Sequence, residues 1–95
     1  MPKVLGYQAP PNQIRWYRKK RKLRIRDVLV LMALSSPSQI AHWEKGRKVP
    51  TLTNALKLSA AIGCPVEVLF IDRFQKLRKE VSERRIKCNI STFFN

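Results

Sequence analysis

Hydrophobic residues recur along the middle of the chain at helical spacing, and polar or small residues divide them into short segments. The first segment predicts a helix over about residues 12–22, with Asn12 as its N-cap and with Ile14 and Tyr17 on one face. The run DVLVLMAL, within about residues 25–34, is apolar on nearly all sides and predicts a second helix at the centre of a bundle. A buried strand is the alternative for that run, although the sequence offers no second strand-like segment to pair with it.

The stretch SPSQIAHWEKG, which follows, carries signals for both ends of a short helix. Ser36 suits the N-cap and Pro37 suits the first helical position. Gln39 is placed to complete a capping box with Ser36. Gly46 suits the left-handed conformation that closes many helices. We therefore predict a helix of about two turns over residues 37–45.

Two further helices are predicted after Pro50. Thr51 is the expected N-cap of the first of them. The residues expected on its core-facing side are Leu52, Ala55, Leu56, Ser59 and Ile62. Gly63 ends this helix, and Pro65 opens a short fifth helix with the sequence PVEVLF. Five short helices with brief connections predict an all-α fold, a compact five-helix bundle.

The two ends of the chain differ from this middle part. Residues 1–11 contain three prolines and no periodicity, which predicts a flexible N-terminal arm. Residues 12–71 hold the predicted bundle. Residues 72–95 combine many cations with apolar residues at helical spacing, which predicts a basic amphipathic C-terminal helical extension. Its apolar positions are Phe74, Leu77 and Val81.

The charge of the chain indicates what such a bundle binds. The 95 residues include 20 Lys+Arg and 6 Asp+Glu, which gives a net charge of +14, and 44% are apolar. This charge predicts an anionic partner, with nucleic acid before an anionic membrane surface. No apolar run reaches the roughly 20 residues that span a bilayer. The N-terminal sequence has no apolar signal-peptide core, so we expect a cytoplasmic protein.

Catalysis and metal binding find little support in the sequence. His42 is the only histidine, and no nucleophile and orienting acid form a constellation with it. Cys64 and Cys88 lack metal-ligand spacing, and two cysteines with one histidine do not complete a common structural zinc site. We therefore expect no enzymatic activity, no cofactor and no metal.

The helix predicted over residues 37–45 suits the major groove of double-stranded DNA. That groove admits a helix, and the base edges in it carry a distinct hydrogen-bonding pattern. Ile40 and Trp43 share the side that would face the core. The predicted base contacts on the outward side are Ser38, Gln39 and His42. The predicted phosphate contacts at its end and just beyond are Lys45, Arg47 and Lys48.

Three motifs together carry a resemblance to a known family. They are S-P-S-x-I-x-x-W-E-x-G-x-x-x-P-T in residues 36–51, N-x-I-R-x-x-R in residues 12–18, and the PVEVLF segment. The set resembles the Cro/repressor-like, or XRE-type, helix-turn-helix family, and the likeness covers about residues 12–70. The resemblance implies a five-helix bundle whose third helix enters the major groove, usually as a dimer on a two-fold-symmetric operator.

The resemblance also implies roles for residues outside that helix. It implies a structural ion pair between Arg18 and Glu44 inside the bundle. Family members commonly carry a glutamine near the start of the second helix that helps to bind phosphate. Ile25 stands there in this chain, between Arg24 and Arg26, and we expect these cations to take over the phosphate contact.

These observations predict a sequence-specific DNA-binding transcriptional regulator, a repressor that acts as a homodimer. An antitoxin-type autoregulator, which would bind a toxin through residues 72–95, is one alternative. A basic RNA-binding protein is another, although the chain lacks the aromatic platform and the glycine signature of common RNA modules. A module for protein contacts alone is disfavoured by the charge of +14.

Overall fold

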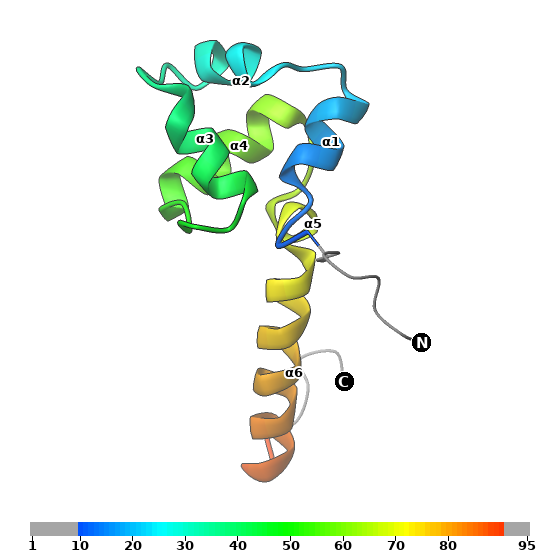
Figure 1. Cartoon of the computed structure of the whole chain (residues 1–95). Helices are drawn as coiled ribbons and strands as arrows, with labels where there is room; N and C mark the ends of the chain where they lie inside the picture. The colour runs from blue at the N-terminus through cyan, green and yellow to red at the C-terminus, as the bar shows by residue number, and fades with distance from the viewer. Residues whose placement is uncertain (1–9, 91–95) are drawn as a thin grey trace, which may run out of the picture.

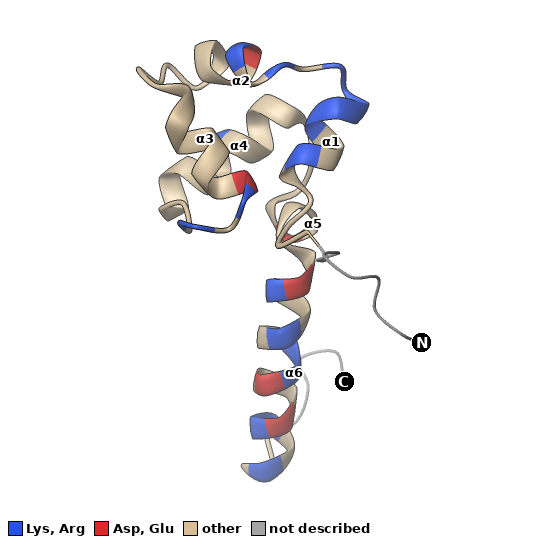
Figure 2. Ribbon diagram, in the orientation of Figure 1, with Lys and Arg blue, Asp and Glu red and all other residues tan. Residues whose placement is uncertain are grey.

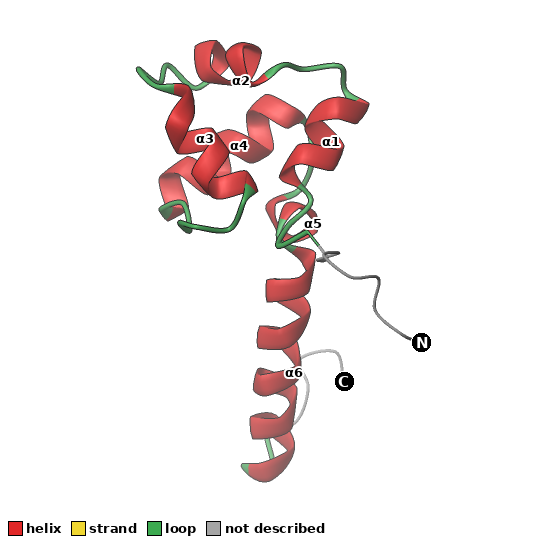
Figure 3. Cartoon of the chain, viewed as in Figure 1, coloured by secondary structure: helices red, strands yellow, loops and turns green. Residues whose placement is uncertain are grey.

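The structure of the protein is a computed structural model that describes residues 10–90, and these residues form helices and connecting loops (Figures 1 and 3). In chain order the helices are α1 (Ile14–Lys20), α2 (Ile25–Leu31), α3 (Pro37–Glu44), α4 (Leu52–Ile62), α5 (Val66–Leu69) and α6 (Ile71–Lys87). The first five helices gather around one core, and α6 projects away from them (Figure 1). The predicted all-α fold is confirmed for the described part of the chain.

The hydrophobic core draws side chains from each of the first five helices. The largest fully buried side chains are Ile14, Val28, Ile40, Leu58, Ile62 and Leu69. Met32, Trp43 and Cys64 complete this cluster. Because α3 contributes both Ile40 and Trp43, the opposite side of α3 is turned away from the core.

Helix α2 is shorter and less buried than the sequence predicts. It ends at Leu31 rather than near Leu34. Val28 is buried within it, but Val30 and Leu31 are exposed. The prediction of a helix covered on nearly all sides is therefore wrong, because the bundle packs against one face of α2 only.

Helix α2 ends where it does because Ala33 adopts a left-handed conformation, with a φ of 54°. The Leu34 amide then donates to the Leu29 carbonyl at 2.9 Å, and the Ala33 amide donates to the Val30 carbonyl at 3.1 Å. These two bonds form a Schellman motif, in which glycine is the usual left-handed residue.

Helix α4 begins and ends as predicted, but its buried face differs. The Thr51 hydroxyl accepts the Asn54 amide at 3.2 Å, and Gly63 ends the helix with a φ of 72°. The buried side chains are Ala55, Leu58 and Ile62. The buried stripe keeps Ala55 and Ile62 but is rotated by roughly 60° from the predicted one, because α4 packs against α2 and α5. Leu52 and Leu56, which were predicted to face the core, are exposed.

Helix α6 begins at Ile71, one residue before the predicted start of the C-terminal extension, and none of its side chains is buried. The predicted boundary at residue 71 stays a prediction. Most of the predicted N-terminal arm, residues 1–9, and the end of the extension, residues 91–95, lie outside the described residues. Among residues 10–90, no helix combines the length and the apolar character needed to cross a bilayer.

Candidate nucleic-acid interface

The start of α3 is fixed by a local cap. The Ser36 hydroxyl accepts the Ser38 amide at 3.3 Å and lies 2.8 Å from the Ser38 hydroxyl. Pro37 occupies the first helical position, as predicted. The predicted capping box with Gln39 does not form, because the two serine side chains bond to each other and Gln39 makes no side-chain hydrogen bond within residues 10–90. The Gln39 amide is therefore left for an external partner.

The outward face of α3 contains the predicted base-reading residues. Ser38 and Gln39 are exposed, and His42 is half-buried. Lys45, the C-cap residue, is exposed at the other end of the helix. Because Ile40 is buried on the opposite side, α3 offers one polar face to the surroundings.

The imidazole of His42 is constrained by its surroundings. Its Nδ1 atom is buried and has no hydrogen-bond partner among the described residues. The other ring nitrogen, Nε2, is therefore the one that is left to bond an external group, and it donates or accepts according to the tautomer of the ring.

The end of α3 is attached to α1 by the ion pair that the resemblance implies. Arg18 Nε donates to Glu44 Oε2 at 2.6 Å, and Arg18 Nη2 donates to Glu44 Oε1 at 3.1 Å. Arg18 Nη1 also donates to the Leu23 carbonyl at 2.9 Å. The two charged side chains are only 8% and 7% exposed. The pair is therefore nearly buried, and it fixes the end of α3 to α1.

A second connection joins the start of α1 to the end of α3. Asn12 Nδ2 donates to the Trp43 carbonyl at 2.7 Å, and Asn12 Oδ1 accepts the Ile14 amide at 3.1 Å. Gly46 follows α3 with a φ of 72°, and a Cβ atom there would lie 2.7 Å from the Cβ of Pro11. Glycine is therefore required at this position both by the backbone conformation and by the approach of Pro11.

Most of the predicted phosphate contacts are exposed cations. Arg26, Lys45, Arg47 and Lys48 form no ion pair within residues 10–90. Figure 2 shows Lys and Arg on α1, on the loop to α2 and on the loop after α3. Asp27 and Glu44 are the only acidic residues before Glu67, and both are paired with arginines. This part of the molecule therefore presents a strongly positive surface.

Arg24, another predicted phosphate contact, already has a partner. Its Nη2 lies 3.2 Å from Asp27 Oδ1, and its backbone amide donates to Asp27 Oδ2 at 2.7 Å. The side-chain hydrogen bond between them raises the pKa of the Arg24 guanidinium and lowers the pKa of the Asp27 carboxyl. A phosphate group at Arg24 would therefore have to compete with Asp27.

A cleft of about 260 Å³ lies between α1, α2 and α3. Its lining residues are Arg15, Arg18, Ile25, Ala41, Glu44 and Lys45. Arg15 and Lys45 are exposed cations that approach the cleft from two different helices. The sequence analysis did not assign a role to Arg15. Arg15 precedes Arg18 by three residues, so the two lie on the same side of a helix. Because the resemblance pairs Arg18 with Glu44, this spacing could have placed Arg15 near α3.

Arg15 belongs to a basic run, residues 15–26, that holds eight of the chain's 20 Lys+Arg, and other cations of this run serve the fold instead. Arg21 donates from Nε to the Ile62 carbonyl at 3.2 Å and from Nη2 to the Gly63 carbonyl at 3.1 Å, which caps the end of α4. Lys20 Nζ lies 4.8 Å from the centre of the Trp16 ring. Fewer residues of this run are therefore available to bind phosphate than the number of its cations suggests.

Cys64 is buried, whereas Cys88 is exposed. Burial raises the pKa of the Cys64 thiol, which disfavours the reactive thiolate. Among residues 10–90, no cluster of three or more His, Cys, Asp or Glu residues is suited to hold a metal ion.

Comparison with known proteins gives one match to a family. The sequence model of a family described as helix-turn-helix matches residues 14–69. No curated protein matches the chain in a sequence search. The matched segment runs from the first residue of α1 to the last residue of α5. It therefore includes α3 and the Arg18–Glu44 ion pair that supports it, and it ends before α6.

Proposed function

Because the chain belongs to the Cro/repressor-like (XRE-type) helix-turn-helix family of DNA-binding transcriptional regulators, we propose that it reads a specific duplex sequence by inserting α3 into the major groove. The observation that carries this proposal is the division of α3 into two faces. Ile40 and Trp43 are buried on one side, while Ser38 and Gln39 are exposed on the other. A helix that is fixed on its inner side and polar on its outer side can present side chains to base edges.

The base-reading roles follow from the chemistry of the exposed side chains. A glutamine amide can bond adenine through N6 and N7 together, so Gln39 is the residue that we assign to adenine. His42 would donate its Nε2 proton to an acceptor on guanine. The Ser38 hydroxyl can serve either base, although Ser36 already competes for it at 2.8 Å.

The phosphate-binding role is assigned to the cations that surround α3. Lys45, Arg47 and Lys48 lie at its end, Arg26 lies in α2, and Arg15 adds a contact beside the cleft. If about four to eight phosphates are neutralised by each protomer, the logarithm of the affinity should fall by about 0.9 per contact for each tenfold rise in salt. These contacts position α3 and do not read sequence.

We further propose that the protein acts as a homodimeric repressor. Two copies of α3 would occupy successive major grooves about 34 Å apart on a two-fold-symmetric operator. Repression would then follow from competition with the transcription machinery for the same DNA.

Selection of bound sites from random duplexes tests this proposal directly. We expect a consensus with two-fold symmetry, and we expect duplex DNA to bind more tightly than structured RNA at about 150 mM salt. Enrichment of no sequence at all, or tighter binding to the RNA, would favour the basic RNA-binding alternative.

An antitoxin-type autoregulator remains a second candidate function. One observation favours it, which is that α6 leaves the bundle with apolar side chains exposed. In that case residues 72–95 would hold a protein partner while the bundle binds the operator.

A further inference from the structure

Helix α6 carries an apolar seam, formed by Phe74, Leu77 and Val81, that the described chain leaves uncovered. These three side chains are 43%, 49% and 54% exposed. Their spacings of three and four residues place them on one side of the helix. In proteins, most of the stability of a helix comes from the packing of its apolar face rather than from helix propensity. A ligand that covered the seam would therefore stabilise α6 as well as bury apolar surface.

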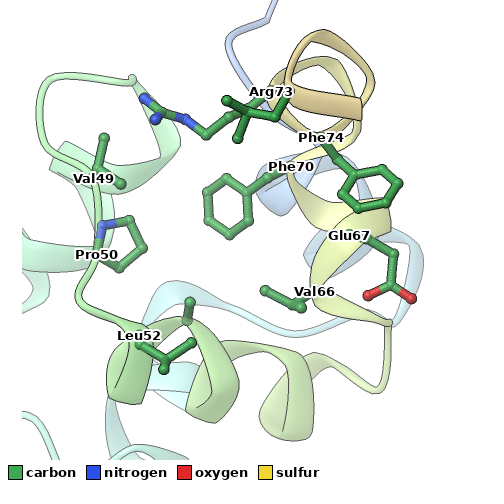
Figure 4. Close-up of a pocket in the computed structure, with 10 residues that line it drawn as sticks. Val49, Pro50, Leu52, Val66, Glu67, Phe70, Arg73 and Phe74 are labelled. Atoms are coloured by element: carbon green, nitrogen blue, oxygen red, sulfur yellow. The ribbon is translucent and has the colours of Figure 1, made fainter. Parts of the chain in front are cut away.

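The seam begins in a groove of about 360 Å³ between the start of α4, α5 and the start of α6. Figure 4 shows the side chains of Leu52, Val66 and Phe70 around this groove, with Arg73 extending along one edge. Phe74 and Leu77 also line it. Leu52 is thus exposed because it forms part of a groove rather than of the core. The groove and the seam together make one elongated apolar surface.

Arginines flank this surface on both sides. At 100° per residue, Arg73 and Arg84 fall on one side of the seam and Arg78 and Arg85 on the other, all within about 75° of it. Arg73, Arg78 and Arg84 form no ion pair within residues 10–90. The apolar surface is therefore bordered by guanidinium groups that are suited to bind carboxylates in a bidentate way.

The opposite side of α6 has a different charge pattern. The acidic residues of α6 lie about 90° or more from the seam. They are Asp72, Glu80 and Glu83. Glu83 lies 4.0 Å from Lys79 on that side. Positive charge is thus concentrated beside the apolar seam and is partly neutralised away from it.

We propose that the groove and the seam bind an acidic amphipathic helix of a partner protein. The apolar face of that helix would pack against Phe74 and Leu77, and its flanking carboxylates would meet Arg73, Arg78 and Arg84. This is the helix-in-groove mode of recognition with complementary charge. The proposal deepens the second candidate function and does not depend on DNA binding by α3.

A second copy of the chain is the rival occupant, and charge argues against it. Residues 71–87 contain seven cations and three acids, so α6 carries a net charge of 7 − 3 = +4. Pairing α6 with α6 would bring arginines beside arginines and would place Arg84 within the seam contact. An acidic helix matches both the apolar character and the charge of the same surface.

The binding test uses the full-length chain and two designed peptides. The first peptide is a helix with Leu and Phe along one face and Glu on both sides of that face. The second has the same composition in a scrambled order, so it keeps the charge and loses the apolar face. We expect the first peptide to bind one per chain at about physiological salt, and at least about tenfold more tightly than the second. Equal binding of the two peptides would reduce the interaction to general charge attraction and overturn the proposal.

Matched variants identify the surface that is used. Leu77→Ser and Arg78→Glu should each weaken binding of the first peptide by about tenfold or more. Lys76→Glu makes the same charge change on the opposite side of α6 and should alter binding by no more than about twofold. Circular dichroism will confirm that each variant keeps its helical content. A loss with Lys76→Glu as large as that with Arg78→Glu would overturn the proposal.

Sedimentation of the chain without peptide tests the rival occupant. We expect Leu77→Ser to leave the oligomeric state unchanged. Conversion of a dimer into a monomer by this substitution would identify a second copy as the occupant and overturn the proposal. DNA binding measured in parallel should be unchanged by Leu77→Ser, so failure of this proposal can be distinguished from failure of DNA recognition.

Discussion

Helices α3 and α6 are both amphipathic and both lie among cations, but the bundle covers the apolar side of α3 and leaves the apolar side of α6 exposed. Helix α3 buries its apolar side chains, Ile40 and Trp43, and presents polar residues outward. Helix α6 exposes its apolar seam, which begins at Phe74, and has no buried residue. The same kind of pattern therefore yields a polar surface where the fold covers the apolar side and an apolar surface where it does not.

The largest expected effect comes from removing the ion pair between Arg18 and Glu44 that supports α3. Glu44→Ala leaves the Arg18 guanidinium buried without its partner, which should lower the free energy of unfolding by about 3–5 kcal/mol. The matched control is Glu83→Ala on α6, whose pair with Lys79 is exposed and 4.0 Å long, and which should cost at most about 0.5 kcal/mol. Urea denaturation of both variants provides the measurement. Equal losses would mean that the buried pair does not fix α3.

The next effect concerns the glycine that follows α3. Gly46→Ala should destabilise the protein by more than about 2 kcal/mol, because a Cβ atom meets both an unfavourable backbone conformation and Pro11. Gly63→Ala shares the φ of 72°, but its nearest side-chain atom is 4.0 Å away at Arg21 Nε. It should cost only about 1 kcal/mol. Thermal and urea unfolding will compare the two variants. If Gly63→Ala lowers the free energy of unfolding as much as Gly46→Ala does, the clash with Pro11 makes no contribution.

The third effect separates sequence reading from docking. Gln39→Ala should cost about 1–3 kcal/mol in binding to the selected site and should relax the preference at one or two base pairs. Leu77→Ser on α6 should leave that binding unchanged. Fluorescence anisotropy with the consensus duplex and single-base variants measures both. If Gln39→Ala retains the site and its affinity, the base-reading assignment is wrong.

The fourth effect tests whether Asp27 restrains Arg24. Asp27→Asn removes the competing charge, so Arg24 becomes free for phosphate and the salt dependence of DNA affinity should steepen by about 0.9. Since the Asp27 pKa is lowered in the folded protein, the stabilisation from this pair is complete above the unfolded pKa. It is lost as pH falls through the folded pKa. Salt titrations at neutral pH provide the measurement, and an unchanged slope would show that Asp27 does not restrain Arg24.

The smallest effect concerns the turn between α2 and α3. Ala33→Gly should raise the free energy of unfolding by about 0.5–1 kcal/mol, because glycine tolerates the left-handed conformation that this residue adopts. Ala60→Gly, at an exposed position inside α4, should lower it by about 0.5–1 kcal/mol. Opposite signs in denaturant unfolding are the expected result, and a loss with Ala33→Gly would contradict it.

Local signals were sufficient to predict the ends of several helices. Ser36, Thr51 and Gly63 act at the positions where the sequence placed them, because a cap depends on a few neighbouring residues. The end of α2 was missed because Ala33 takes a conformation that alanine rarely adopts. Capping preferences therefore predict a helix end correctly where the usual capping residue is present. They fail where the fold imposes the left-handed conformation on another residue.

The burial of whole helix faces was harder to predict, because it depends on which helices become neighbours. Leu52 and Leu56 have the spacing of core residues, yet α4 turns them outward and buries Leu58 instead. The candidate interface shows the same limit. The sequence identified the cations near α3, but only the folded arrangement placed Arg15 beside the cleft and Arg24 against Asp27.

The projection of α6 from the bundle has a consequence for how the molecule could be assembled. At about 1.5 Å per residue, its 17 residues extend about 25 Å from α5. A partner protein bound along the outer turns of α6 would not contact the other five helices and would leave α3 unobstructed. The arrangement of α3 and α6 therefore leaves room for a ternary assembly in which one copy of the chain holds a partner protein at a DNA site.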